Sequence, residues 1–388
     1  MSEAEPSKPR VLLLHNFLAP YRVPLFAELA TRFDLDVWIL GNVRHVRDWP
    51  ADAPGAPFRY RNVPHLTVPL TRYNALVLNY TLAAALARHR HDAIICCAWD
   101  TPATFYTACH ARLTRTPFIL WSGSTAREST RLRTLTKPAV RALVRGATAW
   151  LAYGTRAKDY LVSLGADPER TFRAFNTVET GWFAEACEAA RPQVARLRER
   201  LDIAPDARVV VYCGNLLELK GVGDLLAGFA ELARMREDVT LVLVGSGRGE
   251  AEYRSLVEAA GLGRRVVFAG FVPRPEVPAY YALADLLVLP SRSEVWGLVV
   301  NEALAAGVPV LATDAVGASE DLIQEGRNGY VVPARDPGAL CGAMDRHLSD
   351  ATDLEAMRAA ARESIGPFTI ARAADAFEQA VACALGRA

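Results

Sequence analysis

The chain has 388 residues, of which 51% are hydrophobic and 22% charged, and its formal net charge is +1. This length suits two or three domains of roughly 150 residues each, and the near-neutral charge argues against a nucleic-acid partner. No apolar run reaches the roughly 18 residues that a transmembrane helix needs. The seven cysteines include no Cys-x-x-Cys pair, and the seven histidines show no metal-ligand spacing. Reduced thiols in a cytoplasmic protein without a metal site are therefore expected.

The first half of the chain shows the pattern of a parallel α/β domain. Residues 1–9 are polar and are expected to form a disordered leader, and residues 10–185 the domain itself. Val11–Leu14 is a continuous apolar run, typical of a strand that is buried on both faces. A helical segment and a second apolar strand follow, which is the start of a doubly wound fold. Further along we expect an irregular stretch over 44–71, a helix over 74–90, and strands over 92–97, 118–121 and 149–153.

Polar residues follow the carboxyl ends of these predicted strands, where parallel sheets place their ligands. We expect these residues and Arg22 of the first helix to line the acceptor side of a site, with Asp100 as a catalytic candidate. Other roles remain open: a structural histidine, a helix cap at Asp100 or a turn at Ser122. The first loop lacks Gly-x-Gly-x-x-Gly, which argues against nicotinamide binding. The strand-end candidates are His15, Asn16, Asp100 and Ser122.

The segment 126–146 is basic, with six arginines and lysines against Glu128. Its later part also carries an apolar stripe at helical spacing. A basic amphipathic helix can lie on an anionic membrane surface. The alternative is a surface helix that packs on the sheet and keeps its charges in water.

The second half, residues 186–366, repeats the strand and helix pattern, and a final helix is expected within 367–388. The run that begins at Gly245 resembles a dinucleotide fingerprint but lacks the third glycine at the required step, so we predict a tight turn near a nucleotide. The predicted fold is therefore α/β, with two Rossmann-like parallel-sheet domains that face each other across a cleft.

The most informative run extends from Ser291 to Val310 and reads as loop, helix and strand. Glu294 lies in the loop, the helix begins near Gly297, and Glu302 lies one turn inside it. Unpaired N–H groups at a helix start attract phosphate oxygens, whereas carboxylates accept hydrogen bonds from hydroxyls. The combination suits a sugar nucleotide, in which a diphosphate joins a sugar to a ribose. The alternative is a buried βαβ unit with solvated acids.

The run reads Ser-x-x-Glu-x-x-Gly-Leu-Val-x-x-Glu-Ala-x-Ala-x-Gly-x-Pro-Val. It resembles the paired-glutamate motif of family 4 retaining glycosyltransferases, which have the GT-B fold. The resemblance implies that Glu294 binds the donor sugar, that Glu302 accepts from the ribose hydroxyls, and that the last helix crosses back onto the N-terminal domain. It further implies a base-binding loop and backbone amides at the sugar diphosphate, contributed by Phe271, Val272, Gly297, Leu298 and Val299.

A second signal is the loop from Cys213 to Gly221, which presents Lys220 before a helix. A lysine there can neutralise the leaving diphosphate. The family usually pairs this lysine with an arginine, and here Asn215 stands in the arginine position. Arg248 and Arg292 are the candidates to replace the missing charge. The resemblance implies retention of configuration with the leaving diphosphate as base, and no tightly bound cofactor.

The predicted function is transfer of a hexosyl-type sugar from a UDP- or GDP-sugar to an acceptor hydroxyl. The acceptor is a saccharide, a lipid-linked saccharide or a small molecule, and the setting is bacterial cell-surface polysaccharide or glycolipid assembly. The expected location is the cytoplasm, with peripheral contact to the inner face of the plasma membrane through 126–146. The alternatives are glycosylation of a natural product, a sugar-nucleotide epimerase or phosphorylase, and a non-enzymatic sugar binder.

Overall fold

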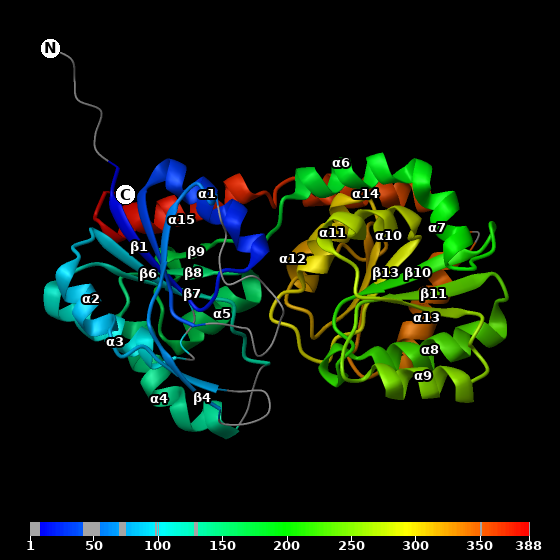
Figure 1. The fold of residues 1–388 in the computed structure, drawn as a ribbon, viewed down its shortest axis with the longest axis horizontal. Coiled ribbons are helices and arrows are strands. Elements are labelled where there is room, and N and C mark those ends of the chain that lie inside the picture. The colour runs from blue at the N-terminus through cyan, green and yellow to red at the C-terminus, as the bar shows by residue number, and fades with distance from the viewer. Residues whose placement is uncertain are drawn as a thin grey trace, which may run out of the picture. The chain divides into compact units, whose positions relative to one another are not determined.

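The computed structural model describes residues 8–41, 55–69, 75–97, 99, 101–127, 131–349 and 351–387. The chain divides into two compact units (Figure 1). The first unit comprises Met1–Val178 and Ile370–Ala388, and the second comprises Glu179–Thr369. Each unit contains its own sheet and its own buried core.

The first unit is built on a seven-stranded parallel sheet with the order β3-β2-β1-β6-β7-β8-β9. A separate antiparallel hairpin, β4–β5, accompanies it. The strands are β1 (Arg10–His15), β2 (Asp34–Ile39), β3 (Arg59–Asn62), β4 (Leu66–Pro69), β5 (Ala75–Leu78), β6 (Ala93–Cys97), β7 (Phe118–Ser122), β8 (Ala149–Ala152) and β9 (Thr171–Arg173). The helices are α1 (Val23–Arg32), α2 (Leu82–Arg88), α3 (Pro102–Thr114), α4 (Arg131–Gly146), α5 (Thr155–Leu164) and α15 (Ile370–Ala384).

Both faces of this sheet are covered, which explains why its central strands β1, β6, β7 and β8 are largely apolar. In β1, Val11 and Leu13 face a core shared with α1 and α15, whereas Leu12 and Leu14 face a core shared with α2 to α5. Since successive strand residues point to opposite faces, a strand between two helical layers has no polar side. The last helix, α15, packs beside α1 (Figure 1), and its Phe377 ring lies edge-on to Trp121 at 4.9 Å.

The second unit repeats this design with a six-stranded parallel sheet in the order β12-β11-β10-β13-β14-β15. Helices α8, α9 and α13 contribute to the core on one face, and Figure 1 shows α6, α10, α11 and α14 on the other. The strands are β10 (Arg208–Cys213), β11 (Val239–Val244), β12 (Val266–Gly270), β13 (Leu286–Leu289), β14 (Val310–Thr313) and β15 (Gly329–Val332). The helices are α6 (Thr180–Ala190), α7 (Val194–Arg200), α8 (Val222–Met235), α9 (Glu250–Ala259), α10 (Val277–Leu283), α11 (Leu298–Ala305), α12 (Ser319–Leu322), α13 (Pro337–Leu348) and α14 (Leu354–Ile365).

In both sheets the strand order reverses beside the first strand, between β1 and β6 and between β10 and β13. Loops that leave such a reversal point in opposite directions open a crevice at the carboxyl edge of the sheet. The prediction of two doubly wound parallel α/β domains is therefore confirmed. In the first unit, His15 ends β1 at this reversal point and Asn16 follows it, and in the second unit the loop that carries Lys220 follows β10.

Two local predictions are wrong. The expected helix over 74–90 is instead the strand β5 followed by the short helix α2, because Ala75–Leu78 pairs with Leu66–Pro69 in the hairpin. The stretch 44–71, expected to be irregular, contains β3 and β4 among its described residues. Pairing with a partner strand, which the pattern of a single segment does not show, decides both cases.

None of the helices in the described ranges combines the length and apolar character that a bilayer span requires.

Candidate functional site

The central feature of the second unit is the approach of the Lys220 loop to the Glu294 loop. Lys220 ends a short 3-10 turn after β10, and Gly221 follows it with φ +69°. A Cβ on Gly221 would lie 1.9 Å from the carbonyl oxygen of Pro290, at the end of β13. Glycine is therefore required here, both for the left-handed backbone and for the close contact.

This approach brings two of the predicted catalytic side chains together. The Nζ of Lys220 donates to Oε2 of Glu294 in an ion pair whose side chains are 22% and 17% exposed. The partners are 74 residues apart in the sequence. The backbone of the Glu294 loop is held in turn, because the amides of Gly317 and Ala318 donate to the carbonyls of Glu294 and Trp296 at 3.1 and 2.9 Å.

The start of α11 lies directly after this loop. Gly297 is its N-cap residue with φ +97°, and a Cβ there would contact Leu289 at 2.9 Å. Leu298 and Val299 form the first turn and are partly buried. The indole of Trp296 donates to Oδ1 of Asn301 at 2.9 Å and fixes the turn from inside. The first amides of α11 are thus positioned next to the Lys220–Glu294 pair, as an anion site requires.

Glu302 lies one turn inside α11 and is partly buried. Its Oε2 accepts a hydrogen bond of 2.6 Å from the hydroxyl of Tyr281. Burial raises the pKa of Glu302 above its ordinary value, and the Tyr281 hydrogen bond and the charge of Arg274 oppose this effect. Tyr281 was not among the residues predicted from sequence.

The remaining predicted donor residues lie at the carboxyl edge of the same sheet. Asn215 is exposed, and its carbonyl accepts from the Tyr212 hydroxyl at 2.7 Å. Gly245 packs against the backbone of Gly214. Phe271 is 75% exposed and Val272 is partly buried.

Arg292, considered from sequence as a substitute for the missing phosphate-binding arginine, is already engaged. Its guanidinium binds both carboxylate oxygens of Asp224 at 2.7 and 2.8 Å and Glu218 at 3.1 Å. Bidentate arginine–carboxylate pairs are strong and directional. Arg292 therefore stabilises the loop that carries Lys220, and it is not a free cation for the ligand.

The first unit holds a second cluster, built around the predicted residues His15 and Arg22. The Arg22 guanidinium lies 4.6 Å from the Trp121 ring centroid and donates to the Tyr153 hydroxyl at 2.7 Å. The His15 ring is 5.6 Å from Trp121. Trp121 and Tyr153 were missed from the sequence because aromatic residues in apolar strands are usually core residues.

His15 is fixed in one tautomer. Its Nδ1 lies 2.7 Å from the carbonyl oxygen of Phe17 and 3.4 Å from the Phe17 amide nitrogen, and the shorter contact assigns the proton to Nδ1. Burial and the charge of Arg22 outweigh this hydrogen bond and lower the pKa of His15 to about 3. Nε2 has no hydrogen-bond partner among the described residues. His15 is thus a neutral imidazole that can accept a hydrogen bond through Nε2.

This burial predicts a pH-dependent stability. The pKa of His15 falls from about 6.5 in the unfolded chain to about 3 in the folded protein, so the unfolded state binds more protons between these values. The contribution of neutral His15 to the free energy of unfolding is therefore fully present above about pH 6.5 and is lost as the pH is lowered toward 3. The loss amounts to about 2 kcal/mol at pH 5. His15→Phe, which keeps a ring but does not titrate, should lose less stability on acidification in urea denaturation at pH 7 and pH 5. Parallel losses in the two proteins would contradict the assignment.

The other acceptor-side candidates have mixed outcomes. Asn16 follows β1 and is partly buried. Ser122, predicted in a loop, is the last residue of β7 and 1% exposed. Its hydroxyl accepts from the amide of Ser124 at 3.1 Å, which is the turn-forming role left open from sequence. Asp100 lies outside the described residues.

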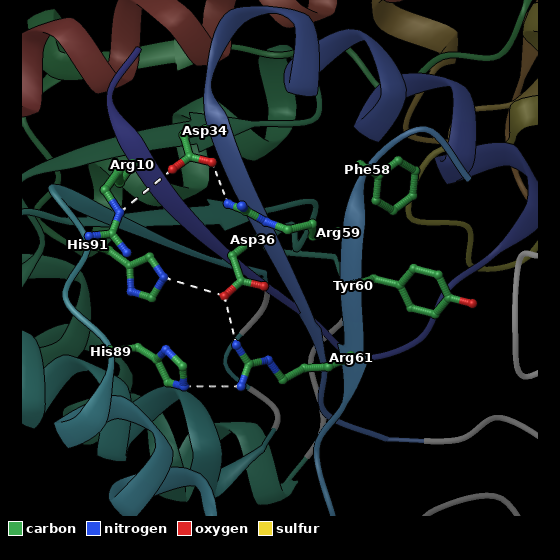
Figure 2. A pocket seen from close by; sticks show the side chains of 9 residues that line it. All are labelled: Arg10, Asp34, Asp36, Phe58, Arg59, Tyr60, Arg61, His89 and His91. Atoms are coloured by element: carbon green, nitrogen blue, oxygen red, sulfur yellow. Dashed lines mark hydrogen bonds and ion pairs between the residues drawn. The ribbon is translucent and has the colours of Figure 1, made fainter. Parts of the chain in front are cut away.

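A polar pocket of about 690 Å³ lies at the opposite edge of the first sheet, at the amino ends of β1 to β3 (Figure 2). Its charges pair with one another. Asp34 binds both Arg10 and Arg59, and Asp36 binds Arg61 at 3.1 Å and lies 3.6 Å from His91. Burial would raise the pKa of Asp36, but His91, Trp38 and Arg61 lower it to about 2. Charged residues on a short edge strand such as β3 prevent pairing with other chains. We assign this structural role to the paired charges that line the pocket.

Comparison with known proteins shows the family of this chain. Residues 193–364 match the family of glycosyl transferases group 1. The alpha-D-kanosaminyltransferase of Streptomyces kanamyceticus is 31% identical over 262 residues, which cover 66% of this chain and 67% of that protein. The chain belongs to the group 1 glycosyltransferases. The chain is also similar to the GDP-mannose-dependent alpha-(1-6)-phosphatidylinositol monomannoside mannosyltransferase of Mycolicibacterium smegmatis, which is 34% identical over 48% of this chain and 49% of its own length. The chain thus spans about half of that relative.

The fold of this group 1 chain is also found in solved structures. Alr3699/HepE of Anabaena, crystallised in complex with UDP, superimposes with a TM-score of 0.74 over 95% of this chain and 98% of that protein. The sequence identity is 19%, so this likeness concerns the GT-B fold alone.

Proposed function

We propose that this group 1 glycosyltransferase moves a hexosyl-type sugar from a UDP- or GDP-sugar to an acceptor hydroxyl, with retention of anomeric configuration. The observation that carries the proposal is the Lys220–Glu294 pair next to the start of α11, with Glu302 one turn further on. These groups present a cation, backbone amides and two carboxylates in one region of the second unit. A diphosphate flanked by a sugar and a ribose offers the complementary chemistry.

Each side chain has a separate task in this proposal. The ammonium of Lys220 and the first amides of α11 stabilise the negative charge that develops on the leaving diphosphate. Glu294 accepts a hydrogen bond from a hydroxyl of the donor sugar, and Glu302 accepts hydrogen bonds from the ribose hydroxyls. Asn215 can contribute a hydrogen bond but no charge, so Lys220 supplies the positive charge that stabilises the diphosphate in this proposal. The acceptor hydroxyl oxygen bonds to the anomeric carbon of the donor sugar on the face from which the diphosphate leaves. The bond between that carbon and the diphosphate breaks, and a diphosphate oxygen takes the proton of the hydroxyl.

The first unit receives the acceptor in this scheme. The Nε2 of His15 is a buried acceptor atom at the carboxyl end of β1, placed as a hydroxyl-binding group should be. A lipid-linked saccharide is the preferred acceptor class, because the similar mannosyltransferase of Mycolicibacterium smegmatis is named for a phosphatidylinositol substrate. Bacterial cell-surface polysaccharide or glycolipid assembly is the corresponding setting.

The proposal is tested by ligand binding and then by turnover. A ligand that binds only the folded protein, present at 100 times its dissociation constant, stabilises the protein by about 2.7 kcal/mol. UDP or GDP should therefore raise the melting temperature, whereas NAD should not. Purified protein should then hydrolyse a matching sugar nucleotide slowly, and with an acceptor present NMR should show the donor's anomeric configuration in the product. Stabilisation by NAD alone would point to another enzyme class.

We further propose that α4 contacts an anionic membrane surface. Lys137, Arg141 and Arg145 are exposed on this helix, and Leu135 is 79% exposed beside them. Val140, Leu143 and Val144 instead pack in the core. The contact is therefore mainly electrostatic and limited to the outer face of the helix.

The expected result is sedimentation with vesicles that contain phosphatidylglycerol and little binding to pure phosphatidylcholine. Each basic residue near such a surface contributes about 1 kcal/mol. Lys137→Glu combined with Arg141→Glu should therefore reduce binding more than tenfold, and added salt should reduce it in the wild type. Equal binding to both kinds of vesicle would contradict an electrostatic contact.

A further inference from the structure

The hydroxyl of Tyr281 makes a specific hydrogen bond that the packing of its ring does not require. Tyr281 lies on α10 and its side chain is fully buried, with the ring edge-on to Phe183 at 6.2 Å. Phenylalanine would fill such a position equally well. The hydroxyl instead donates to Oε2 of Glu302 at 2.6 Å, a short distance typical of a bond to a charged acceptor.

This hydrogen bond limits the freedom of the Glu302 carboxylate. Tyr281 is the only donor for which a hydrogen bond to the carboxylate of Glu302 is seen among the described residues. A glutamate has several rotatable bonds, and a free carboxylate one turn inside a helix can turn toward solvent. With Oε2 held by Tyr281, the carboxylate has fewer accessible orientations, which favours those in which Oε1 can accept a hydrogen bond from a ligand.

The surroundings of Glu302 make the bond more important. Burial raises the pKa of Glu302, and the Tyr281 hydroxyl and the positive charge of Arg274 act against it. Cys187 and Cys213 also face this carboxylate, and both stay neutral because burial raises the pKa of each thiol to about 12. Arg274 is itself held, by Glu179 at 2.8 Å and over the Trp182 ring at 4.6 Å. Without the hydroxyl, the burial effect on Glu302 is less opposed.

We propose that Tyr281 is a positioning residue, which orients the Glu302 carboxylate so that it can accept hydrogen bonds from the ribose hydroxyls of the nucleotide. The inference rests on the proposed function, since it requires that Glu302 binds a nucleotide. Tyr281 itself does not touch the ligand and acts through Glu302.

The chain offers a matched control in the neighbouring residue. Tyr280 is also on α10 and 5% exposed, but its hydroxyl accepts from Arg200 at 3.4 Å and not from the site. Tyr280→Phe and Tyr281→Phe each remove one buried hydroxyl from the same helix. Only the second removal should affect nucleotide binding.

The experiment is calorimetry of the full chain with UDP and with GDP, after melting curves show that each variant is folded. Tyr281→Phe should weaken binding of the nucleotide that the wild type prefers by roughly tenfold, as expected for loss of a hydrogen bond to a charged group. It should also shift the pH profile. Because the Glu302 pKa rises further in this variant, affinity should begin to fall at a higher pH on acidification than in the wild type. Tyr280→Phe should match the wild type in both respects.

A double-mutant cycle separates positioning from a general structural effect. In a Glu302→Gln background, Tyr281→Phe should cause little further loss, because its target is already gone. A full additional tenfold loss there, or unchanged binding by Tyr281→Phe alone, would overturn the inference. A wild type that binds neither nucleotide, or a Glu302→Gln variant that binds like the wild type, would instead refute the proposed site and the inference with it.

Discussion

Replacing Lys220 with alanine is expected to lower kcat roughly a hundredfold, which corresponds to about 3 kcal/mol of transition-state stabilisation. Negative charge on the diphosphate is greater in the transition state than in the bound donor, so the loss should be larger in kcat than in donor affinity. The structure strengthens this expectation. Arg292 is already bound to Asp224, and position 215 holds an uncharged asparagine.

The measurement is steady-state turnover with the active donor, together with calorimetry of the free nucleotide. Lys158→Ala on α5 removes a lysine from the other unit and should leave turnover unchanged. Melting curves are needed for both variants, because Lys220→Ala also leaves Glu294 without its ion-pair partner. A folded Lys220→Ala protein with normal turnover would exclude the assigned role.

Glu294→Gln is expected to reduce turnover by roughly tenfold to a hundredfold, as for loss of a hydrogen bond to a charged group of 1.5–3 kcal/mol. Affinity for free UDP or GDP should not fall, because free nucleotide has no donor sugar. The structure adds a refinement. Glutamine releases Lys220 from its carboxylate partner, so the freed ammonium should bind the diphosphate as well as, or slightly better than, in the wild type.

Glu302→Gln is the matched comparison, since it makes the same chemical change eight positions further along the same segment. It should weaken the free nucleotide itself. Calorimetry of both variants with nucleotide alone distinguishes the two roles. Loss of nucleotide affinity in Glu294→Gln but not in Glu302→Gln would mean that the donor lies in the reverse orientation.

The geometry of α11 was predictable because it is encoded locally. The strand, the Glu294 loop, the left-handed glycine at Gly297 and the helix follow one another within a single βαβ unit. The position of Lys220 was predictable for the same reason, since it follows its own strand. Their direct pairing was not predictable, because it depends on how closely Gly221 lets one loop approach the backbone of Pro290.

The parts that sequence reasoning missed are those with long-range causes. Tyr281, Trp121 and Tyr153 lie in apolar segments and read as core residues, although their polar atoms or ring faces contact Glu302 and Arg22. Residues 75–78 were predicted as part of a helix for a different reason. Their pairing with residues 66–69 makes them a strand, and the sequence pattern of either segment alone does not show that pairing.

The placement of α15 has a consequence for biosynthesis. This helix supplies Ala374, Phe377, Ala380 and Val381 to the core of the first unit, yet it leaves the ribosome only after the whole of the second unit. Domains generally fold in the order of their synthesis. Here the second unit is complete before the first, whose sheet must wait with an uncovered apolar stripe until residues 370–384 have emerged. A released chain that is truncated before Ile370 should accordingly resist protease in the second unit, whereas its first unit should be cleaved readily.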